Sequence, residues 1–503
     1  MIQPYFLKKY LLPFIIYCVI IYNYQSVSIL HERSVGGCCR PLTRMNDKLR
    51  SALTAFDSHT ELRLQQTKNR RVGVVGGNLV TNISANAGGV CARANCMGAW
   101  GFASAGSADD EAVKNVLLHA RENAGLLNAK APKQGKRLAR CAPFSFTDPR
   151  TFKDTEQKTL TEFAMQLDGY ISKTYPDLTS RSVSIAADCV TKELYTSEGS
   201  ISYQLFPRTY VVVSMSVEAE DGTNMDLYDI FGGGEGWFSD YYDDPAALYE
   251  QIDALYTELM KKREGVFPEA GEQLCIIDSA ISGMVAHEAV GHTTEADLVL
   301  AGSVAAGALG AQVASPLVNL TDFANTAFGK RAPLPVFVDE EGVECRDAVI
   351  IKDGILTGYM NNLEAAAHFD MAPTGNARAF AFSDEPLIRM RNTAIHPGKD
   401  RLEDMIASVD RGYYLTRTCN GQADTTGEFM FGITMGYEIR NGRLGSALRD
   451  TTISGVAFNM LKTVDMLSDT VCWDIAGYCG KKQYMTVSMG GPAIRCRVNI
   501  GGR

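Results

Sequence analysis

Two histidines that lie five residues apart, in the stretch AHEAVGHTTEAD (residues 286–297), impose the strongest constraint on how this chain folds. Successive residues of an α-helix are rotated by about 100°, so His287 and His292 would point roughly 140° apart on a regular helix. Their rings converge only if the helix bulges or ends between them. Gly291 permits such a distortion because it has no Cβ. If both histidines bind one metal ion, the helix must therefore bulge or end at this point.

Glu288 directly follows the first histidine, and this order is typical of metal-dependent hydrolysis. In the HExxH arrangement, two histidines bind one metal ion and the glutamate acts as a base. A surface helix end with two incidental histidines is the alternative interpretation. Two histidines need a further protein ligand, and Cys479 is a candidate because a thiolate binds zinc well. A purely structural role for Cys479 is the alternative.

The order of sequence patterns predicts an α+β protein with two domains. A single hydrophobic core stops growing at about 250–300 residues, so a chain of 503 residues favours more than one domain. Residues 45–265 alternate strand and helix patterns and predict an N-terminal α/β domain with a mixed sheet and flanking helices. Residues 266–503 contain hairpin signals at 353–354 and 441–442 and predict a β-rich C-terminal domain that carries the metal helix.

The first 44 residues, 1–44, form a leader that we expect to be disordered. Two lysines precede an apolar run at residues 10–22, which is shorter than the roughly 20 residues that a spanning helix needs. The run fits a signal-peptide core or a weak anchor, and a start at Met45 is the alternative. Export or membrane association through residues 1–30 stays open, and membrane contact is expected only if residues 10–22 are retained as an anchor.

Charge and cysteine content exclude two classes of protein. The net charge is -9 and no long block of lysine or arginine occurs, so we predict no nucleic-acid partner. The 13 cysteines are scattered and odd in number, which favours free thiols in a reducing compartment over a disulfide framework. The glycine-rich stretch at 231–244 lacks the Gly-Lys-[Ser/Thr] of a phosphate-binding loop, so no nucleotide cofactor is predicted.

Several stretches together resemble the TldD/PmbA family of zinc metallopeptidases, on its catalytic TldD side. The resemblance rests on HEAVGHTTEAD and on the later YCGKKQ and VSMGGPAIR. AWGFAS precedes the histidines, and GILTGYMNN, PTGNARAF, RMRNTAIHPG and TTGEFMFGIT follow them in the family's order. The likeness extends from about residue 62 to residue 500, and this shared order is more specific than any single motif.

The resemblance implies three Zn²⁺ ligands, one general base and two supporting carboxylates that orient the histidines. These are His287, His292 and Cys479 for zinc, Glu288 as the base within the family's HExxxH motif, and Glu295 and Asp297 as the supporting carboxylates. The segment TTEAD departs from the LEGD-like sequence of many relatives, which leaves the last two roles as the weaker part of the assignment.

The resemblance also implies a function. We expect a cytoplasmic, zinc-dependent peptidase that hydrolyses unfolded polypeptides or peptide precursors and recognises the peptide backbone, which a strand edge in the C-terminal half would bind. The expected partner is a TldE/PmbA-like sister subunit in a heterodimer, or a second copy in a homodimer. The alternative is a peptide-binding assembly subunit that holds a structural zinc and has no proteolytic activity.

Overall fold

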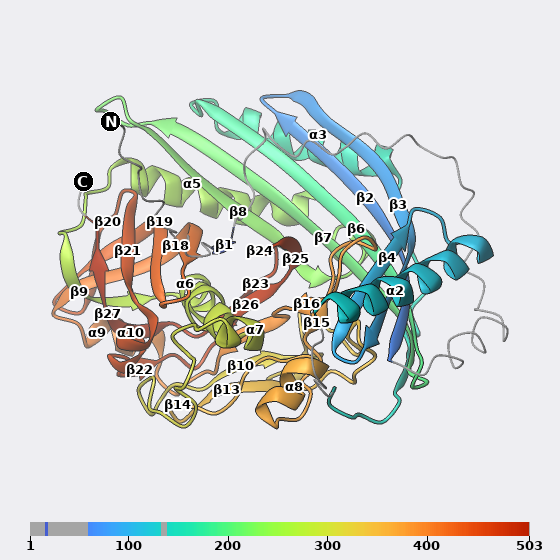
Figure 1. The fold of residues 1–503 in the computed structure, drawn as a ribbon. Helices are drawn as coiled ribbons and strands as arrows, with labels where there is room; N and C mark the ends of the chain where they lie inside the picture. Colours follow the sequence, from blue (N-terminus) through green and yellow to red (C-terminus); the bar gives the residue numbers. More distant parts are fainter. Residues whose placement is uncertain (1–15, 19–58, 132–137, 502–503) are drawn as a thin grey trace, which may run out of the picture.

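The structure is a computed structural model that describes residues 16–18, 59–131 and 138–501. It has the α+β architecture that the sequence predicts (Figure 1). The elements of the N-terminal half are β2 (Thr60–Val75), β3 (Asn78–Cys96), β4 (Ala99–Ala105), α2 (Asp110–Lys130), β5 (Ser145–Thr147), α3 (Gln157–Thr174), β6 (Ser180–Thr196), β7 (Ile201–Glu218), β8 (Asn224–Glu235), α4 (Phe238–Tyr241), η1 (Pro245–Leu248) and α5 (Tyr249–Arg263).

The N-terminal half is one long, mixed sheet with helices on one face. Its strand order is β4-β3-β2-β6-β7-β5 with β8 beside β7, and β5 is parallel to β7 while the other neighbours are antiparallel. Side chains alternate along β2, so Leu62 and Leu64 pack with residues of α2 on one face. On the opposite face, Arg63 donates to the carbonyl of Asp384 at 2.8 Å. The polar face of the sheet therefore contacts the C-terminal half.

The C-terminal half holds two further sheets with short helices between them. The larger sheet has the order β20-β19-β21-β27-β9-β18-β1-β24-β25 with β22 beside β27, and the smaller has β14-β13-β10-β17-β26-β23. The larger sheet consists of β1 (Ile16–Cys18), β9 (Gly271–Ile277), β18 (Arg411–Ala423), β19 (Glu428–Arg440), β20 (Arg443–Ala447), β21 (Thr451–Val456), β22 (Met466–Leu467), β24 (Tyr478–Lys481), β25 (Gln483–Thr486) and β27 (Ile494–Ile500).

The remaining elements complete the β-rich half that the sequence predicts. The smaller sheet consists of β10 (Leu320–Phe323), β13 (Ala348–Lys352), β14 (Ile355–Leu356), β17 (Asn392–Ile395), β23 (Cys472–Asp474) and β26 (Ser488–Gly491). Two short ribbons pair β11 (Thr326–Ala327) with β12 (Lys330–Arg331) and β15 (Ala377–Arg378) with β16 (Leu387–Ile388). The helices are α6 (Ser279–Met284), α7 (Ala296–Leu300), α8 (Leu363–Phe369), α9 (Leu402–Ala407) and α10 (Ala457–Lys462), with the turns η2 (Val285–Gly291) and η3 (His292–Thr294) between α6 and α7.

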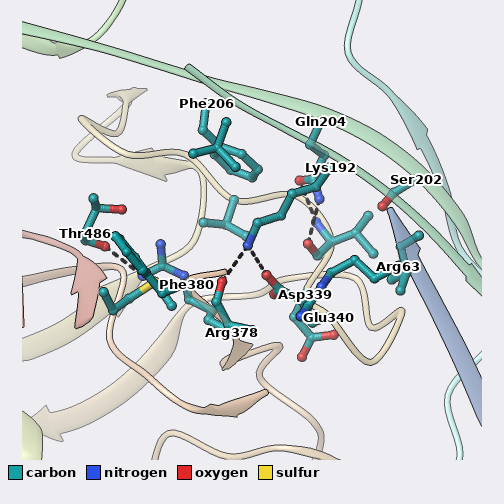
Figure 2. A pocket seen from close by; sticks show the side chains of 16 residues that line it. Arg63, Lys192, Ser202, Gln204, Phe206, Asp339, Glu340, Arg378, Phe380 and Thr486 are labelled. Carbon is teal, nitrogen blue, oxygen red and sulfur yellow. Dashed lines mark hydrogen bonds and ion pairs between the residues drawn. The ribbon is translucent and has the colours of Figure 1, made fainter. Parts of the chain in front are cut away.

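Charged side chains are buried where the two halves meet. Figure 2 shows Lys192 of β6 pointing at Glu340 of the C-terminal half, and its Nζ also donates to the carbonyl of Ala379 at 2.8 Å. Beside it, Gln204 of β7 donates to the carbonyl of Val338 at 2.8 Å. A cavity of about 60 Å³ remains among these groups. The halves are thus joined by specific polar contacts, and the domain division near residue 265 stays a prediction.

A short part of the predicted leader has regular structure. Ile16–Cys18 form β1, which lies between β18 and β24 and pairs antiparallel with both. For these three residues the expectation of disorder was wrong, because two strands with free edges offer backbone hydrogen bonds on both sides. The rest of the leader lies outside the described residues. Within the described ranges, none of the helices combines the length and the hydropathy that crossing a bilayer requires.

A buried charge network ties the start of β2 to the C-terminal half. The ring of His59 lies 2.8 Å from Glu61 and 2.9 Å from Glu198. Arg93 of β3 continues the network, with nitrogens 2.8 Å from Glu61 and 2.6 Å from Glu341. Burial by itself would lower the pKa of His59, but the hydrogen bonds that its ring donates to Glu198 and Glu61, together with their negative charges, outweigh it and raise the pKa to about 10. The imidazole is therefore protonated at neutral pH.

Because of this network, the protein is expected to lose stability as the pH becomes alkaline. Because the folded pKa of His59 exceeds its ordinary value of about 6.5, the stabilisation is complete below about pH 6.5 and is lost as the pH rises towards 10. We expect His59→Gln to lower the melting temperature at pH 7 and to flatten its decline between pH 7 and 10. The exposed His119→Gln is the control. If the melting temperatures of the wild type and of His59→Gln fell equally steeply between pH 7 and 10, the assignment would be wrong.

Candidate metal centre

The two histidines lie on a helix that changes its winding between them. Asp278 caps α6 by accepting the N–H of Ser279 at 2.7 Å, and α6 passes into the π-helical turn η2 and then into the 3₁₀ turn η3. The N–H of His292 donates to the carbonyl of His287, which is the i→i+5 bond of a π-helix. The two ring centres lie 5.1 Å apart. The bulge that the five-residue spacing requires is thus present.

Gly291 is needed here for a different reason from the one that the sequence indicates. Its φ is -55°, which is ordinary helical backbone that any residue adopts. A Cβ at this position, however, would lie 2.2 Å from Sδ of Met390 and 3.1 Å from the carbonyl oxygen of Ala286. The glycine therefore permits close packing against Met390, and its conformational freedom is not used.

A cysteine from the far end of the chain completes the cluster. Cys479 lies on β24, and its Sγ is 3.1 Å from Nε2 of His292. The candidate ligand atoms of His287, His292 and Cys479 all lie within 4.8 Å of one another, and the three side chains are buried. The structure therefore brings together the three residues that were predicted as metal ligands, which span 192 positions of sequence from His287 to Cys479.

The chemistry of these three side chains fits a zinc ion. Burial holds the pKa of both histidines well below its usual value, so their rings are neutral and their nitrogens can bind a metal. Neither ring nitrogen of His287 has a hydrogen-bond partner among the described residues. Ligand atoms around a tetrahedral zinc lie about 3.3–3.8 Å apart, given bonds of about 2.0–2.3 Å. Side-chain adjustments of about 1 Å would bring the set to that geometry.

The protonation state of the Cys479 thiol also depends on its surroundings. Burial, together with the nearby carboxylates Glu288 and Glu295, raises the pKa of Cys479 to about 12, although Arg389 opposes this effect. The cysteine is therefore a neutral thiol in the absence of a cation. A divalent metal would stabilise the thiolate form, because only the thiolate is a strong ligand.

The three predicted carboxylates occupy different positions. Glu288 is fully buried, with Oε1 3.7 Å from Nε2 of His287. Glu295 accepts a hydrogen bond from Nδ1 of His292 at 2.8 Å, which turns Nε2 of that ring towards Cys479. Asp297 differs from the prediction that it orients a histidine, because it is part-exposed and its carboxylate lies 2.8 Å from Nζ of Lys481.

Two cations near the cluster were not predicted from the sequence. The fully buried Arg389 donates to the backbone carbonyl of Cys479 at 2.8 Å and to that of Gln483 at 2.9 Å. Lys481 lies 3.2 Å from Glu295 and thereby links Asp297 to the histidine pair. Both cations fall within stretches that carry the family resemblance, RMRN and YCGKKQ. That position was the only signal in the sequence, since neither residue type is typical of a metal site.

Comparisons with known proteins show which family the chain resembles. Residues 270–502 match the family described as PmbA/TldA metallopeptidase C-terminal domain, and residues 60–124 match PmbA/TldA metallopeptidase domain 1. A zinc metalloprotease TldD homolog from Saccharolobus solfataricus is 30% identical over 66% of this chain and 73% of its own length. A metalloprotease from Methanocaldococcus jannaschii is 30% identical over 89% of this chain and 98% of its own.

Solved structures show the same fold. The crystal structure of TldE from Thermococcus kodakarensis has a TM-score of 0.71 with this chain, at 17% sequence identity. The match covers 91% of this chain and 99% of the TldE chain. At this identity the likeness concerns the arrangement of helices and strands.

Proposed function

The chain belongs to the TldD/PmbA family of metallopeptidases, and on this premise we propose that it is a zinc-dependent peptidase acting on unfolded polypeptides or peptide precursors. The observation that carries the proposal is the buried cluster of His287, His292 and Cys479 with Glu288 beside it. Three protein ligands leave one position of a tetrahedral zinc open, which is typical of catalytic rather than structural zinc.

In this proposal each residue near the cluster has a separate task. A bound zinc would supply Lewis acidity, by acidifying a water molecule and polarising the peptide carbonyl. Glu288 accepts the proton of the attacking water and passes it to the leaving amine. Glu295 fixes the ring of His292 by its 2.8 Å hydrogen bond, and Arg389 fixes the backbone of Cys479. Burial of all these groups excludes bulk water and strengthens their electrostatic effect.

The position of β1 supports an extended peptide as the substrate. Cys18 pairs with Cys479 of β24 on one side and with Gly421 of β18 on the other. We call the space between β18 and β24, which β1 occupies, the peptide slot. A peptide in this slot would be held by backbone hydrogen bonds, which almost all sequences can make equally. The slot would admit unfolded chains and exclude folded ones. We further propose a TldE-like sister subunit as the partner, since the fold is shared with TldE.

Metal removal and restoration test the proposed activity. We expect the purified chain, with its sister subunit where one is encoded, to cleave a chemically denatured polypeptide and to leave the same polypeptide intact when folded. Treatment with a chelator should abolish cleavage, and one equivalent of Zn²⁺ per chain should restore it. Bound zinc with no cleavage of any unfolded chain would favour the alternative, a peptide-binding assembly subunit with a structural metal.

A further inference from the structure

A large cleft lies at the junction of the two halves, beyond the metal cluster. It has a volume of about 720 Å³, within the range of about 300–1,000 Å³ that is typical of ligand sites. Its walls come from β8 and α5 of the N-terminal half and from β18, β19 and β23 of the C-terminal half. None of the residues of the metal cluster lines it, so it is a separate feature of the surface.

The peptide slot leads directly towards this cleft. β1 runs antiparallel to β18 and β24, and Cys18 lies opposite Gly421 and Cys479. A peptide in the same position that continued towards its C-terminus would next pass residues 416–418 of β18 and residue 475, all of which line the cleft. These residues lie three to five positions further along, or about 10–17 Å at about 3.3 Å per residue.

The cleft is lined by aromatic rings and an excess of carboxylates. The rings belong to Tyr228, Tyr414, Tyr437 and Trp473. The carboxylates are Asp229, Glu258, Asp278 and Asp474, and the cations are Lys261 and Arg417. Arg417 lies 3.1 Å from Asp229 and 3.5 Å from Glu258, so it offsets the charge of that pair.

The other two carboxylates are held by hydrogen bonds. Burial raises the pKa of Asp474, and the positive charge of Arg208 only partly opposes this effect. Asp278 accepts hydrogen bonds from the hydroxyl of Tyr414 at 2.8 Å and from the N–H of Ser279, and Asp474 accepts one from the N–H of Ala476 at 3.0 Å. Neither has an ion-pair partner within the described ranges. The hydroxyl of Thr416, on the same wall, is buried and has no hydrogen-bond partner there either. The cleft therefore offers hydrogen-bond acceptors and aromatic residues to a positively charged side chain.

We propose that this cleft binds a lysine or arginine side chain of the substrate, three to five residues on the C-terminal side of the cleaved bond. A basic side chain is complementary to these features of the site: carboxylates attract its charge, tyrosine rings can bind it through their π-electrons, and its aliphatic stem can pack against the rings. The inference rests on the proposed peptidase function, because the metal cluster sets the position from which the residues are counted. It adds a side-chain preference to the backbone recognition of the slot.

A binding measurement tests this inference without depending on cleavage. The full-length Glu288→Gln protein, loaded with zinc, is titrated with two unstructured fluorescent peptides that differ only in carrying lysine or glutamine at several positions. We expect the lysine peptide to bind about tenfold more tightly. Combining Asp278→Asn with Asp474→Asn in the same protein should remove this difference, and Asn at 278 can still cap α6. The exposed Asp410→Asn is the control and should retain the preference.

The outcomes separate the two proposals. Equal affinity for the two peptides, or a lysine preference that survives the double substitution, would overturn the inference about the cleft. If the inference is right, cleavage sites mapped by mass spectrometry with the wild-type protein should show lysine and arginine enriched three to five residues after the cut. Enrichment on the N-terminal side would also refute the inference. Absence of all cleavage alongside a clear lysine preference would instead contradict the peptidase function alone.

Discussion

Glu288→Gln is expected to reduce kcat/KM on an unfolded polypeptide by about 10²–10⁴-fold while the protein retains its full zinc content. An amide has nearly the shape of the carboxylate but cannot accept the proton of the attacking water, and a positioned general base contributes about this factor. Because Glu288 is fully buried and is not one of the three proposed ligands, its replacement removes the base and leaves the cluster intact. Activity is measured by peptide release and zinc by elemental analysis.

Glu220→Gln, on an exposed turn, is the matched control and should cleave at the wild-type rate. If Glu288→Gln also cleaved at that rate, a different group would have to be the base. If it lost zinc as well, Glu288 would act on the metal itself rather than on the proton.

Cys479→Ser is expected to lower the affinity for zinc by more than about 100-fold and to abolish cleavage. Loss of a group that merely supports a ligand costs about 10–100-fold in metal affinity, so loss of a ligand costs more. A serine hydroxyl is a much weaker zinc ligand than a thiolate at neutral pH. Competition with a chromogenic chelator measures the affinity, and a circular dichroism spectrum checks that the fold persists.

Cys141→Ser replaces an exposed cysteine outside the cluster and should leave both zinc affinity and cleavage unchanged. Tight zinc binding by Cys479→Ser would show that another side chain completes the ligand set, in contradiction to the cluster described above.

Local features of the fold could be predicted because short-range geometry determines them. The histidine spacing required the helix to bulge or end if the two rings were to converge, and a π-helical turn is present. The turn pairs at 353–354 and 441–442 predicted two hairpins, and both Asp353 and Asn441 have positive φ values, of 50° and 48°. The strand and helix patterns of the first half predicted a mixed sheet with flanking helices.

Long-range features could not be predicted from single patterns. The residues around Cys479 made it only a candidate ligand with a structural role as the alternative, and the family resemblance was what assigned it to the metal. The role of Arg389 depends on a contact with a backbone carbonyl 90 positions away, which leaves no pattern in the side chains. The resemblance assigned Asp297 to the support of the histidines, whereas in the structure its carboxylate lies 2.8 Å from Nζ of Lys481. The peptide slot arises from strands that are adjacent only in the folded chain.

A deletion of one residue between His287 and His292 would convert the wide turn into an ordinary helical turn. Both imidazoles would still share one side of the helix, because residues four apart on an ordinary helix lie about 40° from each other. The residues between them would be repacked, however, and position 291 already lies so close to Met390 that a Cβ there would be 2.2 Å from its sulfur. The wide turn is thus matched to the packing around it, and lineages that keep the activity are expected to keep this spacing fixed while the surrounding sequence changes.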